Sequence, residues 1–230
     1  MKQLERQLAL YLVTDRGLLQ GRELLSCVLE AVLGGVGIVQ LREKDCSARD
    51  FVALGRRLQE ILAPHAVPLI INDRIDVALA IGADGVHVGQ EDITTADARR
   101  ILDAFPIPRH KRKRGGGKRL ILGVSVEDAN QARQAEKDGA DYLGASVVYA
   151  TNTKTDYQKT IGADGVREIC NAVDIPVVAI GGINTTNIHE LAAIPKLAGV
   201  ALVSAILSAP DIQNAARQYA TLWKEHTCHR

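Results

Sequence analysis

Polar and charged side chains recur where apolar segments of this chain end, and their types suit the binding of anions. The segment VGIVQLREK, residues 36–44, places Gln40, Arg42 and Lys44 at its end. Because side chains alternate along a strand, these three share one face. Two cations and an amide on one face make a poor core and a good anion site. The alternative is an exposed strand end whose charges pair with neighbouring helices.

Carboxylates follow the next two apolar segments. Asn72 and Asp73 end one of them, and Asp92 closes the sequence HVGQED at residues 87–92. Carboxylates from neighbouring strand ends can share one hard cation, and Mg²⁺ is usually held by one or two carboxylates together with phosphate oxygens. The sequence therefore suggests a magnesium site at Asp73 and Asp92. The alternative is that both aspartates are helix N-caps, which their positions also fit.

Hydroxyl, ammonium and glycine groups follow the later apolar segments. Glycines after one strand and the turn after the next expose backbone N–H groups, which form a common phosphate site in barrels of alternating strands and helices. The candidates in this half of the chain are Ser125, Thr151, Thr153, Lys154, Gly182, Val203 and Ser204.

The elements that must position these residues are eight short apolar, β-branched runs. We expect strands at residues 8–14, 36–42, 67–72, 84–89, 119–125, 141–146, 175–182 and 199–205. Stretches with helical periodicity lie between them, most clearly at residues 23–35, 48–64 and 126–139. Asp and Ser tend to open these stretches and Gly tends to close them, as helix caps would.

This alternation predicts an α/β fold, a (β/α)₈ TIM barrel that forms a single domain over residues 1–230. All the candidate residues then lie at the carboxyl ends of the strands, where such barrels carry their active sites. A doubly wound open sheet is the alternative architecture. No G-x-G-x-x-G motif follows the first strand, which counts against a dinucleotide-binding sheet.

Composition excludes several other classes of protein. The 230 residues are 47% hydrophobic and 24% charged, as in ordinary globular proteins. No apolar run is long enough to span a membrane, and the first residues do not resemble a secretory signal. Four scattered cysteines without a C-x-x-C motif indicate reduced thiols. We therefore expect a cytoplasmic protein.

One strongly basic segment stands apart from a chain whose formal net charge is only +1. Residues 110–119 read HKRKRGGGKR, with six Lys or Arg side chains and no aromatic residue. Three glycines and six cations cannot bury a face, so we expect a solvated surface insertion within the barrel domain. A nucleic-acid or anionic-surface patch is the alternative, and the absence of aromatic residues disfavours it.

Together these motifs resemble the thiamine phosphate synthase family. The resemblance covers roughly residues 10–206 and rests on QLREK (40–44), ND (72–73), HVGQED (87–92), GVS (123–125), the T-x-T-K of residues 151–154, GGI (181–183) and VSAI (203–206). The combination of Q-x-R-x-K with HVGQED is specific. GGI or VSAI alone would be shared by many phosphate-binding barrels.

The resemblance implies a transferase of thiamine biosynthesis. Its reaction joins 4-amino-5-hydroxymethyl-2-methylpyrimidine diphosphate to a thiazole (carboxy)ethyl phosphate, giving thiamine phosphate and diphosphate. Carried over residue by residue, the family pattern implies that the pyrimidine diphosphate is bound by Gln40, Arg42, Lys44, Asn72, Ser125 and Lys154, of which Arg42, Lys44, Ser125 and Lys154 are catalytic. The thiazole phosphate would be bound by Thr151, Thr153, Gly182, Val203 and Ser204. Asp73 and Asp92 would bind Mg²⁺.

Two other functions remain as alternatives. One is an isomerase similar to the related thiazole tautomerase, which would need the phosphate site but neither Q-x-R-x-K nor the paired carboxylates. The other is a non-catalytic barrel that binds thiamine precursors. In every case the expected partners are small phosphorylated molecules, with no nucleic acid and no membrane, while the oligomeric state stays open.

Overall fold

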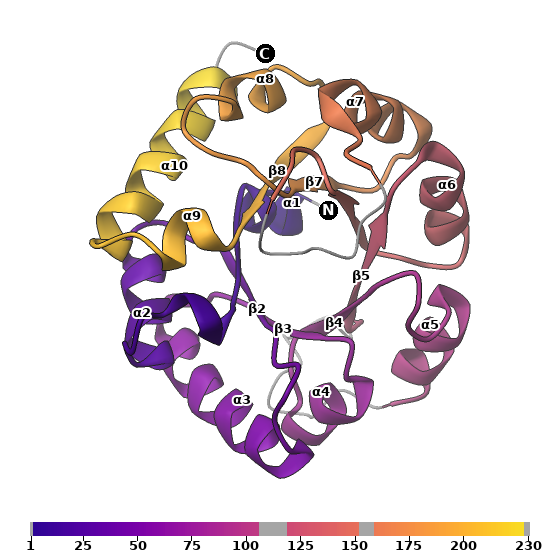
Figure 1. Cartoon of the computed structure of the whole chain (residues 1–230). Helices are drawn as coiled ribbons and strands as arrows, with labels where there is room; N and C mark the ends of the chain where they lie inside the picture. The colour runs from indigo at the N-terminus through magenta and orange to yellow at the C-terminus, as the bar shows by residue number, and fades with distance from the viewer. Residues whose placement is uncertain (1, 106–118, 152–158, 228–230) are drawn as a thin grey trace.

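The computed structural model describes residues 2–105, 119–151 and 159–227. Within these residues, eight parallel strands form a closed barrel in chain order, and the last strand pairs with the first (Figure 1). The strands are β1 (Leu10–Val13), β2 (Ile38–Leu41), β3 (Leu69–Asn72), β4 (Gly85–Val88), β5 (Ile121–Val126), β6 (Tyr142–Ser146), β7 (Val177–Ile180) and β8 (Leu197–Leu202). The predicted (β/α)₈ barrel is confirmed.

Helices surround the barrel and cover the outer faces of its strands (Figure 1). They are α2 (Leu24–Leu33), α3 (Ala48–Leu62), α4 (Ile75–Ile81), α5 (Thr95–Ala104), α6 (Ala129–Lys137), α7 (Gly162–Ala172), α8 (Ile188–Ala192), α9 (Ser204–Leu207) and α10 (Ile212–Thr227), with short 3₁₀ turns η1 (Arg16–Leu18) and η2 (Ala63–His65). One further helix, α1 (Lys2–Leu8), lies inside this ring in the view of Figure 1. Among these described residues, no helix combines the length and the apolar composition that crossing a bilayer requires.

Local sequence explains where several helices begin. The Ser47 hydroxyl accepts a hydrogen bond from the Asp50 N–H at the start of α3, and the Asp128 carboxylate accepts bonds from two N–H groups at the start of α6. Such caps satisfy donors that the first helical turn leaves unpaired. The last strand begins and ends earlier than the expected residues 199–205. It ends at Leu202, and helix α9 begins at Ser204.

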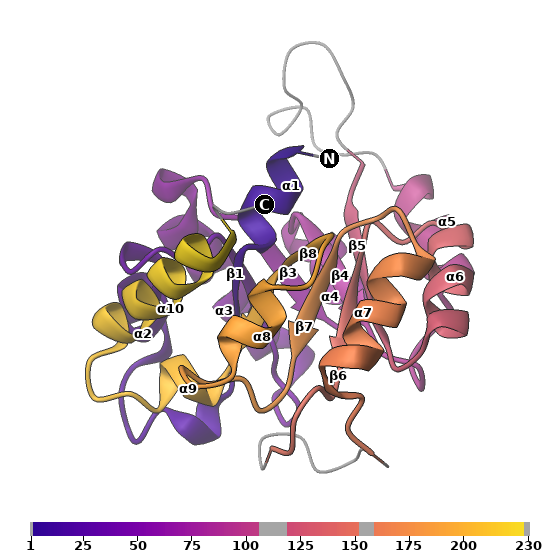
Figure 2. The ribbon, with the colours of Figure 1, turned by 90° about the horizontal axis from the view of Figure 1, so that it is seen from above.

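The apolar core has two parts, as expected for a barrel. The larger part lies between the strands and the helices, and a smaller cluster fills the barrel interior with side chains such as Ile38, Ile70 and Val178. Helix α1 lies at the amino-terminal end of the barrel, opposite the ends from which the strands lead into their helices (Figure 2). Leu8, at the end of α1, belongs to the interior cluster and is fully buried. The chain thus closes one end of the barrel and leaves the other for a site.

Candidate active site

A cavity of about 520 Å³ lies at the carboxyl ends of the strands. It is lined by every candidate residue that the structure describes: Gln40, Arg42, Lys44, Asn72, Asp73, Asp92, Ser125, Thr151, Gly182, Val203 and Ser204. The other two candidates, Thr153 and Lys154, lie outside the described residues. Residues from seven different strand ends therefore meet in one pocket, as the fold predicted from sequence requires.

The basic residues after β2 line the pocket with two different neighbours. The Arg42 guanidinium lies 3.5 Å from the Asp15 carboxylate, and its backbone N–H donates to the Thr14 hydroxyl at 3.0 Å. The Lys44 ammonium donates to Asp73 Oδ2 at 3.1 Å. Both side chains keep part of their surface exposed, 31% for Arg42 and 55% for Lys44. Because both also line the cavity, their exposed parts are accessible to an anion that enters it.

Asp73 sits immediately after β3 in a left-handed backbone conformation with φ of 58°. Its Oδ2 accepts hydrogen bonds from Lys44 and, at 2.6 Å, from the Asn72 amide. Burial raises the pKa of Asp73 above its ordinary value, the Lys44 bond lowers it in part, and the neighbouring Asp92 carboxyl raises it again. Two carboxyl groups thus lie close together, and the bond from Lys44 offsets only part of the cost of burial and of their mutual repulsion.

Neither aspartate is a helix cap, so the alternative interpretation from sequence is wrong. Arg74 occupies the N-cap position of α4 without a side-chain cap bond, and Thr94 caps α5. Asp92 instead accepts a hydrogen bond at 2.7 Å from the Gly89 N–H, within the loop between β4 and α5. The described residues hold no group of three or more metal-ligating side chains. The pair fits Mg²⁺, which commonly takes one or two carboxylates and completes its coordination with water and phosphate oxygens.

The ends of β6, β7 and β8 form the opposite side of the pocket. After β6 the chain continues along β7, since the Val148 N–H donates to Ile180 O and the Tyr149 N–H donates to Gly181 O, both at 3.0 Å. Gly182 has φ of +63°, and a Cβ there would lie 2.6 Å from the carbonyl oxygens of Tyr149 and Ala150. This tight backbone packing brings Gly182 close to the residues that precede Thr151.

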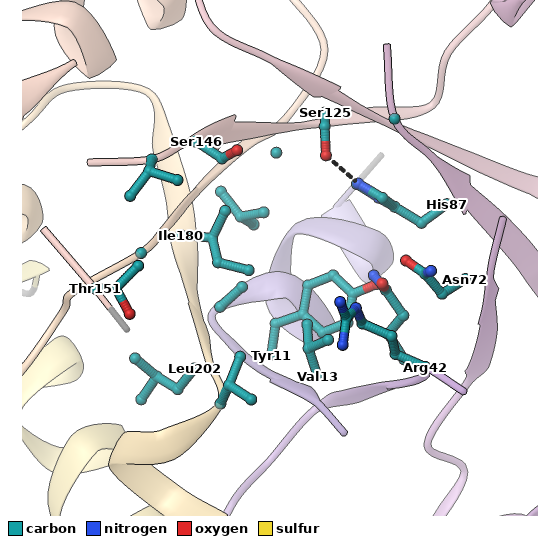
Figure 3. Close-up of a pocket in the computed structure, with 18 of the residues that line it drawn as sticks. Tyr11, Val13, Arg42, Asn72, His87, Ser125, Ser146, Thr151, Ile180 and Leu202 are labelled. Atoms are coloured by element: carbon teal, nitrogen blue, oxygen red, sulfur yellow. Dashed lines mark hydrogen bonds between the residues drawn. The ribbon is translucent and has the colours of Figure 1, made fainter. Parts of the chain in front are cut away.

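Figure 3 shows Thr151 on one side of the cavity, with Arg42 and Asn72 on the other. The glycine turn after β7 and the first turn of α9 at Ser204 lie on the Thr151 side of the lining, and N–H groups of such turns suit a phosphate. The pocket can therefore hold two anionic groups, one at each side, with a carboxylate pair beside the basic side.

Sequence reasoning missed part of the site, which lies deeper in the barrel. Tyr11 and Tyr142 are fully buried and bond to each other, and His87 bonds to Tyr142 and to Ser125. His87 itself is buried, with 8% of its surface exposed. A signal for the tyrosines did exist in Gly123 and Gly144, whose missing side chains leave room for the rings of Tyr142 and His87.

Comparisons with known proteins agree with this geometry. Residues 10–206 match the model of the family described as thiamine monophosphate synthase. The chain is 45% identical over 213 residues to a thiamine-phosphate synthase of Clostridium novyi (strain NT), covering 93% of this chain and 97% of that protein. It is 44% identical over 218 residues to one of Syntrophomonas wolfei, covering 95% and 97%.

A solved structure is also similar along its whole length. The thiamine phosphate pyrophosphorylase from Pyrococcus furiosus superposes with a TM-score of 0.83 at 35% identity, covering 97% of this chain and 98% of that one. The likeness therefore extends to the complete barrel and to every strand that contributes a residue to the pocket.

Proposed function

The chain belongs to the thiamine monophosphate synthase family, whose members are transferases, and we propose that it joins a pyrimidine diphosphate to a thiazole phosphate. The first substrate is 4-amino-5-hydroxymethyl-2-methylpyrimidine diphosphate and the second is a thiazole (carboxy)ethyl phosphate. The products are thiamine phosphate and diphosphate.

One observation carries the proposal: a single cavity is lined by basic side chains on one side, by a glycine turn and a helix start on the other, and by a carboxylate pair beside the basic side chains. A substrate with one phosphate, as in an isomerase, would use the glycine turn after β7 and the start of α9. It would leave Arg42, Lys44 and the two aspartates without a role. Two phosphorylated substrates, one with a diphosphate, account for both sides of the pocket.

The bond changes are a substitution at the methylene carbon of the pyrimidine. The bond from this carbon to the diphosphate oxygen breaks, and both electrons leave with the diphosphate. The electron-rich aminopyrimidine stabilises the cation that remains, and the lone pair of the thiazole nitrogen then forms the new carbon–nitrogen bond. Because that nitrogen carries no proton, the step needs no general base.

The protein's contribution is electrostatic and positional. Arg42 and Lys44 stabilise the charge that grows on the departing diphosphate, which is the largest kind of catalytic contribution in many enzymes. Gln40 and Asn72 orient the pyrimidine substrate, while Thr151, Gly182 and Ser204 hold the thiazole by its phosphate. Holding two reactants in line supplies a proximity effect of roughly 7–11 kcal/mol when the geometry is good. We assign Thr153 to the thiazole phosphate, and Ser125 and Lys154 to the pyrimidine diphosphate as catalytic residues.

Asp73 and Asp92 are the residues that would bind Mg²⁺. When bound there, the ion supplies positive charge to the diphosphate oxygens. The raised pKa of Asp73 supports this assignment, because a carboxylate pair of this kind is stabilised by an added cation. We further propose that the reaction takes place in the cytoplasm on freely diffusing substrates, consistent with three free cysteines among the described residues.

The test is an assay of the purified protein with both substrates, with Mg²⁺ or with a chelator in its place. We expect thiamine phosphate only when both substrates and the divalent ion are present. An Arg42→Ala variant serves as the control for contaminating activity. If the protein makes no thiamine phosphate under any of these conditions, the proposed function is wrong.

A further inference from the structure

A line of hydrogen bonds crosses the barrel interior beneath the pocket and joins two of the proposed substrate-binding residues. The Gln40 amide donates to the Tyr11 hydroxyl at 2.8 Å, and the Tyr11 and Tyr142 hydroxyls lie 2.8 Å apart. The Tyr142 hydroxyl lies 2.9 Å from His87 Nδ1. His87 Nε2 lies 2.9 Å from the Ser125 hydroxyl, the bond drawn in Figure 3. Five strands, β1, β2, β4, β5 and β6, contribute to this interior network.

The network is built into the barrel at some cost to packing. Tyr11, Tyr142 and Gln40 are 1%, 0% and 4% exposed, in an interior otherwise filled by aliphatic side chains. Two glycines make room for it: a Cβ on Gly123 would lie 2.2 Å from Tyr142 Cζ, and one on Gly144 would lie 3.2 Å from His87 Cε1. An aliphatic interior would avoid burying polar groups, so this arrangement points to a use beyond packing.

Each hydroxyl has one proton, and this fixes the direction of the bonds. Within the described residues, the Tyr11 hydroxyl contacts two polar groups, the Gln40 amide and the Tyr142 hydroxyl. It accepts from Gln40, so its own proton goes to Tyr142. Burial raises the pKa of both tyrosines, which therefore stay neutral phenols.

The same reasoning carries the direction to the pocket. The Tyr142 oxygen accepts from Tyr11, so its proton goes to His87 Nδ1. The histidine proton then lies on Nε2 and is donated to the Ser125 oxygen. The Ser125 proton is left to point away from His87, toward the cavity that Ser125 lines.

We propose that Tyr11, Tyr142 and His87 are positioning residues that hold the Ser125 hydroxyl as a hydrogen-bond donor toward the diphosphate-bearing substrate. The inference rests on the proposed function for the identity of that substrate. The direction of the bonds is a property of the free protein and can be tested without it. At the other end, the same bonds turn the Gln40 N–H toward Tyr11, which leaves the amide oxygen to accept from the substrate.

The first test identifies which ring nitrogen of His87 carries the proton. It uses ¹⁵N NMR on the free protein at a pH high enough for the imidazole to be neutral. A His87→Gln variant assigns the signal among the six histidines of the chain. We expect the proton on Nε2. A proton on Nδ1 would reverse the bonds from Tyr11 through His87 to Ser125, use the Ser125 proton on His87 and overturn the inference, whatever the enzyme's activity.

The second test is Tyr142→Phe, which removes one oxygen and keeps the ring. Without the Tyr142 hydroxyl, Ser125 is no longer held as a donor to the charged diphosphate. We therefore expect kcat/KM for the pyrimidine diphosphate to fall about tenfold, as for one lost hydrogen bond to a charged group. The KM for the thiazole phosphate should stay within about twofold. The matched control is Tyr219→Phe, which removes the same atom from a buried tyrosine of α10 and should leave both constants unchanged.

A double-mutant cycle separates positioning from general damage to the fold. If Tyr142 acts through Ser125, then Tyr142→Phe should have less than about a twofold effect when Ser125 is already alanine. An undiminished tenfold effect in that background would show that Tyr142 acts by another route. Equal activity of Tyr142→Phe and the wild type would overturn the positioning role while leaving the proposed function intact.

Discussion

Charge is unevenly shared among the residues at the basic side of the pocket. Lys44 bonds to Asp73, and Arg42 lies beside Asp15, so each cation already has a carboxylate neighbour. Asp92 adds a third carboxyl group close to Asp73 and raises its pKa. Ionising both aspartates therefore has an electrostatic cost in the free protein, and a divalent cation would remove that cost.

Asp73→Asn should separate function from stability. The folded-state pKa of Asp73 is raised, so its ionised form destabilises the fold at pH values above the raised pKa and has no such effect below the unfolded value of about 4. The variant should lose at least about a hundredfold in kcat. At pH 7 without divalent ions, its free energy of unfolding should exceed that of the wild type by about 0.2–1 kcal/mol, the range for a partly solvated group. Its urea midpoint should therefore be higher.

Urea unfolding at several pH values checks this prediction, because the advantage of the variant should shrink as the pH falls toward 4. Added Mg²⁺ should stabilise the wild type and not the variant, through preferential binding to the folded state. An Asp73→Asn protein less stable than the wild type at pH 7 would mean that the Lys44 bond outweighs burial and the Asp92 charge.

The two sides of the pocket should differ in their kinetic effects. Ser204→Ala removes a hydroxyl proposed to contact the thiazole phosphate, a bond to a charged group worth about 1.5–3 kcal/mol. It should raise the KM for the thiazole phosphate roughly ten- to a hundredfold and leave the pyrimidine KM little changed. Arg42→Ala should lower kcat and weaken pyrimidine diphosphate binding, because charge develops there in the transition state.

Steady-state kinetics with each substrate varied in turn measures these constants. Should Ser204→Ala weaken only the pyrimidine substrate, the assignment of the two sides would have to be exchanged.

Residue type and strand alternation were enough to predict the polar residues at the strand ends. They did not predict the roles of Tyr11 and Tyr142. In sequence, a tyrosine inside an apolar run looks like any core residue, because the sequence does not show which group its hydroxyl bonds to. That partner lies 131 positions away in the chain, and only barrel closure brings the two hydroxyls together.

At the scale of elements, the shape of the phosphate side depends on how the chain leaves β6 and β7. The two exits run together through backbone hydrogen bonds from Val148 and Tyr149. Strand positions were predictable to within about two residues because fully buried strands are continuous apolar runs. The end of β8 was less predictable, since Val203 continues the apolar run after the strand has ended.

Gly182→Ala tests this contact between the two exits. The left-handed conformation costs alanine about 1–3 kcal/mol, and the new Cβ would also displace the backbone at residues 149–150. We expect lower stability and a KM for the thiazole phosphate raised about tenfold or more. Gly21→Ala is the matched control, because Gly21 also has positive φ but a Cβ there would have no atom within 4 Å. If both variants bind the thiazole phosphate equally well, packing at Gly182 does not shape the phosphate side.

At the scale of the whole molecule, the barrel divides its two ends between stability and chemistry. Helix α1 lies against the amino-terminal end, where a Cβ on Gly199 would fall 1.9 Å from the Leu8 carbonyl oxygen. The cavity lies at the opposite end, among the carboxyl ends of the strands. The connection from α5 to β5 runs from a helix end to a strand start, so its flanking residues belong to the α1 end.

The basic insertion predicted at residues 110–119 falls in this connection, and all of it except Arg119 lies outside the described residues. Arg119 anchors the start of β5: its guanidinium donates to the Gly139 carbonyl at 2.7 Å and to Asp141 at 3.1 Å. A deletion of residues 111–118 therefore removes five of the six basic side chains and keeps this anchor.

That deletion should leave kcat and both KM values within about threefold of the wild type, a change of under about 1 kcal/mol. The reason is distance along the barrel, because the flanking residues are at the end opposite the cavity. The kinetic constants should be measured at low ionic strength, where electrostatic steering of anionic substrates is strongest, and again at about 0.15 M salt. A rise in either KM that is large at low salt and vanishes at high salt would show that the basic segment attracts the phosphorylated substrates. A rise at both salt concentrations would instead place the segment in contact with the pocket, contrary to the architecture argued from the strand ends.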